Sequence, residues 1–339
     1  MAIHRTLAFA ALVASTALVA FAASLHAQSG HLLVIEKGSQ SLAVVDPASA
    51  QKLGSAAETG ITGHEVAASP DGKYAYVPIY GNSGVGKPGT DGSQLDVIDL
   101  ATRQVVGTLT FDHGVRPHDP VIGPKDHLLY VTTELDKTIT VIDPKDPKNP
   151  KIVATIPTGS AESHMLALSH DGKRGYTANV GPGTVSVLDI PNRKTLTIIP
   201  ISGNTQRISI SPDDKYVFTS DQTKPQLAVI STATNTVTKW IPLPSTGYGT
   251  ASTPDGRWLL VDCMPSKQVV VIDLKTLTVA HTIDVPATPQ ELLVNPNNKV
   301  AYTSCDRTNQ VAEIDLATWK VSRLIPTAKS ADGLAWSSK

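Results

Sequence analysis

The chain has 339 residues, of which 17% are charged, and its formal net charge is −1. A nearly neutral chain lacks the basic field that binds nucleic acid, so this class of function is excluded. The 24 glycines and 24 prolines indicate many turns, and the length suits one closed all-β domain.

The N-terminal segment predicts export from the cytoplasm. Arg5 precedes an apolar run from Leu7 to Ala23, which is the order found in secretory signal peptides. We expect residues 1–27 to be removed, with cleavage near Ala27 or after Ser24, and residues 28–339 to form a periplasmic or secreted domain. An uncleaved anchor is the alternative, although the run is shorter than the ~20 residues that a membrane span needs. After cleavage no segment is expected to contact a membrane.

A turn phrase such as Ser-Pro-Asp-Gly, followed by a basic residue and a short apolar run, recurs along the chain. Its copies begin at Ser69, Gly123, Ser169, Ser211, Thr253 and Asn295. From Ser169 onward the copies are 42 residues apart, and one further step reaches Ser337. A period of this length with four strands is typical of a propeller blade.

A second phrase, an alternating strand that ends in Ile-Asp or an equivalent pair, occurs seven times. These strands end at Asp46, Asp99, Asp143, Asp189, Ser231, Asp273 and Asp315. Alternation with period two between turns predicts antiparallel hairpins. Seven copies of this phrase predict seven blades.

The two ends of the chain hold one blade between them. Leu32 to Ala57 supplies three strands, and Ala331 to Trp336 supplies one. Pairing them would remove the free sheet edge that an open ring exposes. The predicted fold is therefore all-β: a seven-bladed β-propeller with four antiparallel strands per blade, closed by N-terminal strands that pair with a C-terminal strand.

Three segments carry a family resemblance. Tyr130-Val131-Thr132-Thr133 is close to a YVTN motif, while Tyr176-Thr177-Ala178-Asn179 and Tyr302-Thr303-Ser304-Cys305 are looser copies. The mature chain resembles the YVTN-repeat propellers, the YncE-like family of exported bacterial proteins. The resemblance implies the fold, and because these motifs build blades it implies no particular activity.

One position in the repeat is polar in every copy. Five residues before each turn stand His64, His118, His164, Gln206, Tyr248, Gln290 and Asp332. Because the first strand of each blade lines the central channel, we expect these side chains to form a ring at the channel mouth. Chance would place about 0.2 histidines in the ring, whereas three occur on consecutive blades.

The three histidines predict a transition-metal site. Imidazoles that converge from His64, His118 and His164 could hold Cu, Zn or Fe with an open position for water or substrate. Glu65 and Asp119 follow two of them and could orient the rings or bind the metal directly. The alternative is that the histidines form hydrogen bonds only with water and neighbouring loops.

The only sizeable insertion, Tyr80 to Ser93, lengthens the spacing of the first two turns to 54 residues. We expect this loop on the same face as the ring. Its candidate ligand contacts are Tyr80, Asn82, Lys87 and Asp91, and the alternative is a solvated loop without a ligand.

A second loop enters the channel with several polar side chains, among them His113 and Arg116. Arg116 could bind a substrate carboxylate or phosphate. The interpretation that we favour pairs it with Asp112 or Asp119 instead.

The opposite side of the channel is predicted to be a neutral, hydrogen-bonding wall. It is formed by Gln206, Arg207, Tyr248, Gln290 and Glu291, with Asp332 beside it. A histidine-rich wall that faces such a wall suits a small polar ligand.

The two cysteines, Cys263 and Cys305, occupy the same register in neighbouring blades. A disulfide would require their Cα atoms to lie within ~7 Å. We favour two free thiols and keep the disulfide as the alternative.

Three functions remain open at this point. The first, which we favour, is an exported propeller that binds a small polar ligand beside a histidine-bound metal. The second is a metal-dependent enzyme of lactonase, lyase or oxidase type that uses the same site. The third is a scaffold or redox-partner subunit that docks a protein partner.

Overall fold

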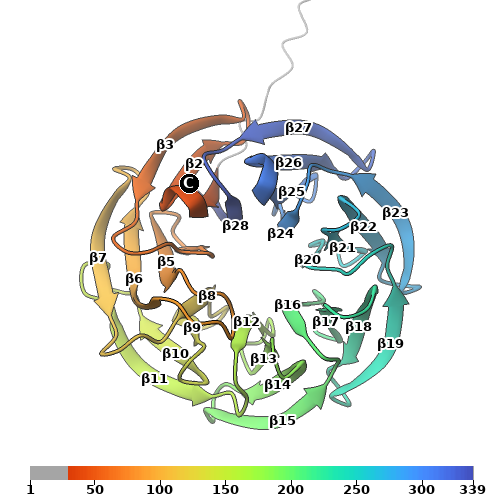
Figure 1. Ribbon diagram of the computed structural model, residues 1–339, viewed down its shortest axis with the longest axis horizontal. Helices are drawn as coiled ribbons and strands as arrows, with labels where there is room; N and C mark the ends of the chain where they lie inside the picture. The colour runs from red at the N-terminus through yellow and green to blue at the C-terminus, as the bar shows by residue number, and fades with distance from the viewer. Residues whose placement is uncertain (1–29, 339) are drawn as a thin grey trace, which may run out of the picture.

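Seven four-stranded antiparallel sheets surround a central axis in the computed structural model, which describes residues 30–338 (Figure 1). Each sheet is one blade, and its first strand lies innermost in Figure 1. The predicted seven-bladed fold is confirmed. The predicted signal peptide, residues 1–27, lies outside the described residues.

The chain enters the ring through blade 1 and closes it there. Blade 1 contains β28 (Ala331–Ser337), β1 (His31–Glu36), β2 (Ser41–Asp46) and β3 (Gln51–Ala57). Strand β1 pairs with β28 in antiparallel register, with Leu32 opposite Trp336. The closure predicted from the two chain ends is therefore confirmed, and it leaves no inner strand without a partner in this blade.

The other six blades follow in chain order. Blade 2 contains β4 (Ala67–Ala68), β5 (Tyr74–Gly81), β6 (Asp91–Asp99) and β7 (Gln104–Thr110). Blade 3 contains β8 (Pro117–Ile122), β9 (Leu129–Thr133), β10 (Thr138–Asp143) and β11 (Lys151–Pro157). Blade 4 contains β12 (Ser163–Leu168), β13 (Arg174–Asn179), β14 (Thr184–Asp189) and β15 (Lys194–Pro200).

Blade 5 contains β16 (Thr205–Ile210), β17 (Tyr216–Asp221), β18 (Gln226–Ser231) and β19 (Thr236–Pro242). Blade 6 contains β20 (Thr250–Ser252), β21 (Trp258–Cys263), β22 (Gln268–Asp273) and β23 (Thr278–Asp284). Blade 7 contains β24 (Pro289–Val294), β25 (Val300–Cys305), β26 (Gln310–Asp315) and β27 (Lys320–Pro326). Two single-turn 3-10 helices, η1 (Lys37–Ser39) and η2 (Asp306–Thr308), follow β1 and β25.

The repeated turn joins the first two strands of a blade. In the first copy the Ser69 hydroxyl donates to Asp71 Oδ1 at 2.7 Å and accepts from the backbone N–H groups of Lys73 and Tyr74. Gly72 closes the turn at φ +68°, a backbone conformation that glycine adopts at little cost. The side chain at the start of the phrase therefore replaces backbone hydrogen bonds that the turn leaves open.

The apolar core lies between blades rather than in one central cluster. One buried cluster joins Leu33 and Ile35 of blade 1 to Val77 and Ile79 of blade 2, and the other clusters join neighbouring blades in the same way. Because the interfaces between blades take up the apolar side chains, the channel mouth is free to carry polar ones. Among the described residues no helix has the length and apolar character needed to cross a membrane.

Cys263 and Cys305 are free thiols, the interpretation that the sequence analysis favoured, and both are fully buried. Burial raises the pKa of each thiol to about 12, so thiolate is scarce at neutral pH. We expect neither thiol to react with a chromogenic disulfide reagent in the folded protein at pH 8, and two to react in urea without reductant. Fewer than two reactive thiols in urea would indicate a disulfide and contradict the structure.

Candidate functional site

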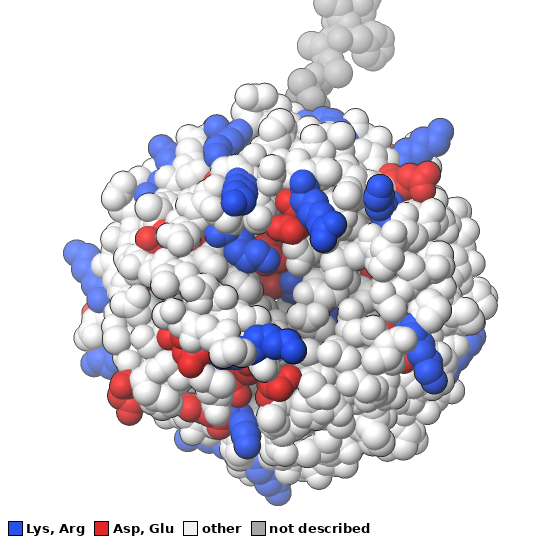
Figure 2. All heavy atoms as spheres, viewed as in Figure 1, with Lys and Arg blue, Asp and Glu red and all other residues white. Residues whose placement is uncertain are grey.

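The site lies on the face that carries η1 and η2, where the loops between second and third strands surround the axis (Figure 1). Figure 2 shows this face, with side chains of both charges around a central hollow. The first strands reach this face through β-bulges. In β16 the register shifts between Thr205 and Ile208, so Gln206 and Arg207 both leave regular pairing. Bulges of this kind redirect side chains.

The same irregularity occurs in four other blades. It lies at His118 and Asp119 in β8, at His164 in β12, at Gln290 and Glu291 in β24, and at Asp332 in β28. In β8, β16 and β24 two consecutive residues can therefore turn toward the channel mouth, although the sequence analysis assigned only the first of them to the ring.

Arg207 of blade 5 crosses the channel and joins four other blades. Its Nη1 atom lies 2.5 Å from Glu65 Oε1 of blade 2 and 2.6 Å from Glu291 Oε2 of blade 7. Its Nη2 atom lies 3.5 Å from Asp332 Oδ1 of blade 1, and its guanidinium carbon lies 5.2 Å from the Tyr248 ring centre of blade 6. The prediction that the wall opposite the histidines is neutral is wrong, because Arg207 carries a positive charge there and pairs with Glu65 and Glu291.

The Arg207 cluster, which we define as Arg207, Glu65, Glu291, Asp332 and Lys37, holds more carboxyl groups than cations. Lys37 Nζ binds Asp332 Oδ2 at 2.8 Å. Burial raises the pKa of Glu65 well above its ordinary value and also raises that of Glu291, although Arg207 opposes both shifts. Burial acts on Asp332 too, but the positive charges of Lys37 and Arg207 oppose it, and the pKa of Asp332 is lowered. The cluster therefore retains protons on some carboxyl groups near neutral pH.

Asp262 of β21 lies beside this cluster and is fully buried. Its Oδ1 atom accepts from the Thr303 hydroxyl at 2.8 Å, whereas its Oδ2 atom has no hydrogen-bond partner among the described residues. Burial raises the pKa of Asp262 well above its ordinary value. The carboxyl group is therefore protonated more readily in the folded chain than in the unfolded chain.

Asp262→Asn is expected to stabilise the protein at pH 8 and to change little at pH 4. The raised pKa means that the aspartic acid contributes full stability below about pH 4 and loses it as pH rises through its folded-state pKa. Asparagine keeps the Thr303 hydrogen bond without a charge, which we expect to be worth about 1–3 kcal/mol at pH 8. Urea unfolding at both pH values checks this. A difference from the parent protein that does not grow with pH would contradict it.

The three predicted histidines do meet at the channel mouth. The rings of His118 and His164 stack with centroids 3.6 Å apart, and the His64 ring lies edge-on to His118 at 5.4 Å. Tyr80, one of the predicted ligand contacts, packs among all three rings. Burial lowers the pKa of each of these histidines, so all three are neutral at pH 7.

This arrangement does not have the geometry of a metal site. An imidazole binds a metal in the plane of its ring, and stacked rings do not direct their nitrogens at one point. Within residues 30–338 no group of three or more His, Cys, Asp or Glu side chains could hold a metal ion. Glu65 binds Arg207, and Asp119 accepts from the Leu166 backbone N–H, rather than supporting the imidazoles. The Cu, Zn or Fe ion stays a prediction.

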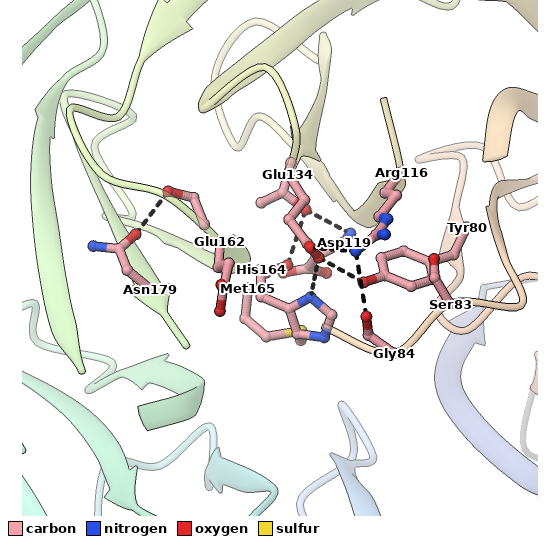
Figure 3. A network of polar contacts seen from close by, with 12 residues as sticks. Tyr80, Ser83, Gly84, Arg116, Asp119, Glu134, Glu162, His164, Met165 and Asn179 are labelled. Atoms are coloured by element: carbon pink, nitrogen blue, oxygen red, sulfur yellow. Dashed lines mark hydrogen bonds and ion pairs between the residues drawn. The ribbon is translucent and has the colours of Figure 1, made fainter. Parts of the chain in front are cut away.

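Glu134 lies at the centre of a polar network that the sequence analysis did not find. Figure 3 shows it between Tyr80, Arg116 and His164. The Tyr80 hydroxyl donates to Glu134 Oε2 at 2.6 Å, His164 Nδ1 lies 3.4 Å from the same oxygen, and Arg116 Nη1 lies 3.1 Å from Oε1. Burial alone would raise the pKa of Glu134, but these three contacts outweigh it and lower the pKa.

A signal for Glu134 was present in the repeat. Tyr80 and Glu134 both stand eleven residues after the first residue of their turns, and Lys37 directly follows the second strand of blade 1 in the same way. This position opens onto the channel mouth in each case. Aligning it across the blades, as was done for the first strands, would have found Glu134 and Lys37.

The predicted partners of Arg116 are wrong. Its Nε atom binds Asp91 at 2.7 Å, and its Nη1 atom binds Glu134, rather than Asp112 or Asp119. Asp112 instead pairs with His113, whose other ring nitrogen contacts Asp136. This exposed pair lies in the rim loops, away from the contacts of Glu134.

The remaining predicted residues frame the site. Asn82 and Lys87 are exposed in the inserted loop; Asn82 Oδ1 accepts from the Thr90 N–H, and the Lys87 carbonyl accepts from Arg116. Gln206 is half-buried and Gln290 is buried. Neither glutamine side chain has a hydrogen bond within residues 30–338, so their amides are available to a ligand.

Grooves on the opposite face are a separate feature. One of about 520 Å³ lies between the turns of blades 5 and 6, and its lining includes Asp213, Tyr216 and Asp255. It contains none of the residues of the channel mouth. The groove is therefore not part of the candidate site.

Comparison with known proteins agrees with the fold. A chain titled hydrazine synthase, from Kuenenia stuttgartiensis, is 20% identical with a TM-score of 0.73, and the match covers 86% of this chain and 93% of that one. The periplasmic gluconolactonase of Pseudomonas aeruginosa is 16% identical with a TM-score of 0.72, covering 91% and 99%. At these identities the similarity concerns the fold alone, and no curated protein sequence matches the chain.

The family comparison goes further than the structural one. The model described as "Lactonase, 7-bladed beta-propeller" matches residues 13–241, which is more than half of the chain. The finer assignment to the YVTN-repeat group stays a prediction. The chain belongs to the lactonase family of seven-bladed β-propellers.

Proposed function

We propose that this protein hydrolyses a small polar lactone at its channel mouth, with His164 as the general base. The observation that carries the proposal is the contact between His164 Nδ1 and Glu134 Oε2, at 3.4 Å, in a site where both side chains are almost fully buried. Membership of the lactonase family supports the choice of a lactone. The P. aeruginosa relative is titled a gluconolactonase, which suggests the first substrate to test.

Glu134 fixes how His164 can act. Its carboxylate is held by Tyr80 and Arg116. His164 Nδ1 has no hydrogen bond within residues 30–338, and a carboxylate oxygen 3.4 Å away favours the tautomer whose Nδ1 carries the proton. The Nε2 lone pair, on the side of the ring away from Glu134, is then free to take a proton from water. That water oxygen bonds to the lactone carbonyl carbon, the ring C–O bond breaks, and the imidazolium returns the proton to the departing ring oxygen. The product is a hydroxy acid.

The Arg207 cluster supports the same reaction. Negative charge develops on the lactone carbonyl oxygen during attack, and donors fixed in place stabilise it. Arg207 Nε, which has no hydrogen-bond partner within residues 30–338, is such a donor. The unpaired amides of Gln206 and Gln290 are suited to bind substrate hydroxyl groups.

Export is part of the proposal. Arg5 and the apolar run that follows it support secretion, and N-terminal sequencing of the exported protein would locate the cleavage site. The docking of a partner protein, predicted as another function, stays a prediction.

The direct test is acid release from δ-gluconolactone, followed in a pH-stat and corrected for spontaneous hydrolysis. The expected result is saturable turnover that survives dialysis against EDTA. Turnover that EDTA abolishes and one metal restores would replace the general-base route by a metal-assisted one. No acceleration with any of a panel of sugar lactones and aliphatic lactones would overturn the proposed function.

A further inference from the structure

Arg116 joins two parts of the site that come from different blades. It lies in the segment between β7 and β8 and is only 5% exposed. Its guanidinium binds the Glu134 carboxylate of blade 3 through Nη1. The same group binds Asp91 and two backbone carbonyls, of Gly84 at 3.3 Å and Lys87 at 2.7 Å, all in or next to the Asn82–Thr90 loop of blade 2. Figure 3 shows the contacts with Glu134 and Gly84.

The backbone of Arg116 is also unusual, because its φ angle is +49°. Residues other than glycine rarely adopt this conformation and do so at a cost. The surrounding contacts hold it there: its N–H donates to the Gly92 carbonyl, and its own carbonyl accepts from the Glu134 N–H. The conformation is therefore fixed by the same two segments that the side chain joins.

The Asn82–Thr90 loop extends toward a third blade. At Gly86 a side chain would meet the Glu162 carboxylate of blade 4, with Cβ only 2.7 Å from Oε1. Glu162 directly precedes the β12 strand that carries His164. The loop thus lies over the part of the rim between its own blade and the blade of His164.

We propose that Arg116 is a positioning residue that couples the Asn82–Thr90 loop, as a substrate-contacting loop, to the His164–Glu134 pair. When the loop is in place, its two carbonyls and Asp91 hold the guanidinium where it can bind Glu134. Glu134 in turn orients the His164 ring. The inference rests on the proposed function for its catalytic consequence, whereas the coupling itself depends only on the contacts described.

Four variants separate the two sides of Arg116. Asp91→Asn removes the negative charge that Arg116 contacts on the loop side and keeps the contact with Glu134. Glu134→Gln removes the charge on the histidine side and keeps the contacts with the loop. Arg116→Ala removes both, and Arg116→Lys keeps the charge with fewer hydrogen bonds. Arg193→Ala is the matched control, because Arg193 is exposed and also has a positive φ angle.

Two readouts do not require turnover. Hydrogen–deuterium exchange reports on the loop, where the Asn82 and Lys87 N–H groups are bonded to Thr90 and Gly84. Nitrogen-15 NMR of the His164 ring reports whether Nδ1 carries the proton. Steady-state kinetics with the lactone then separates KM, which the loop is expected to influence, from kcat, which the pair is expected to control.

The expected pattern assigns each variant a different result. Asp91→Asn speeds exchange in the loop and raises KM by about tenfold, as for the loss of a charged hydrogen bond, with the His164 tautomer unchanged. Glu134→Gln changes the His164 tautomer and lowers kcat, while exchange in the loop stays as slow as in the parent protein. Arg116→Ala does both, Arg116→Lys recovers part of each, and Arg193→Ala matches the parent.

Two outcomes overturn the inference. Faster loop exchange in Arg116→Ala with the parental tautomer would mean that no coupling exists. Unchanged loop exchange in Arg116→Ala would mean that Arg116 does not hold the loop. If the parent protein shows no lactone hydrolysis, the proposed function fails, and exchange and NMR still decide the coupling. If Arg116→Ala does not fold, the same comparisons are made with Arg116→Lys.

Discussion

His164→Gln is expected to lower kcat for lactone hydrolysis by about 10²–10⁴-fold, the usual contribution of a general base. Glutamine can still donate a hydrogen bond toward Glu134, but its side chain has no basic nitrogen. His164 stacks on His118 and is 3% exposed, so a side chain of similar length avoids a large cavity. The measurement is the rate of acid release at saturating lactone, with the melting temperature as the check on folding.

Three further variants, at His64, His118 and His170, identify what a loss of activity means. His118→Gln alters the neighbouring ring, which has no contact with Glu134, and we expect a smaller loss of kcat. His170→Ala changes an exposed histidine on the opposite face and should have no effect. Equal losses in His64→Gln, His118→Gln and His164→Gln, together with loss of a bound metal, would favour a metal site. Retention of more than half of the parental kcat by His164→Gln would contradict its role as the base.

The fold could be predicted from the sequence because each repeat specifies its own local structure. The turn at Ser69 is closed by its own side chains and by Gly72, and the copies at Ser169, Ser211 and Thr253 repeat the hydroxyl contacts. The number of blades then follows from counting copies. The two incomplete ends, β1 to β3 and β28, could only be placed together, because a propeller buries its blades by closing the ring.

The site was predicted less completely, since it depends on departures from the repeat. Alignment brought His64, His118 and His164 together, and the rings do meet. Alignment could not show that the bulges in β8, β16 and β24 free two residues each from regular pairing, or that Arg207 reaches Glu65 on the far side. Contacts made by long side chains across a channel depend on its width, which no register in the sequence encodes.

Arg207→Met is expected to destabilise the protein by about 3–5 kcal/mol at pH 8, the usual cost of removing one partner from a buried ion pair. Methionine fills part of the volume but leaves Glu65, Glu291 and Asp332 without their shared cation. The loss should shrink toward pH 5. Without Arg207 the folded-state pKa values of these carboxyl groups rise further, so protons neutralise them as pH falls.

Urea unfolding at pH 5 and pH 8 measures this effect. Lys37→Met is the matched control: Lys37 is 27% exposed and contacts only Asp332 in the cluster, so its loss should cost less. The double variant Glu65→Gln with Arg207→Met should recover part of the stability at pH 8, because one uncompensated charge is gone. If it recovers none, Arg207 supports the channel by the volume that it fills. If it does recover stability, the cation is what permits three carboxyl groups to share the centre of the ring.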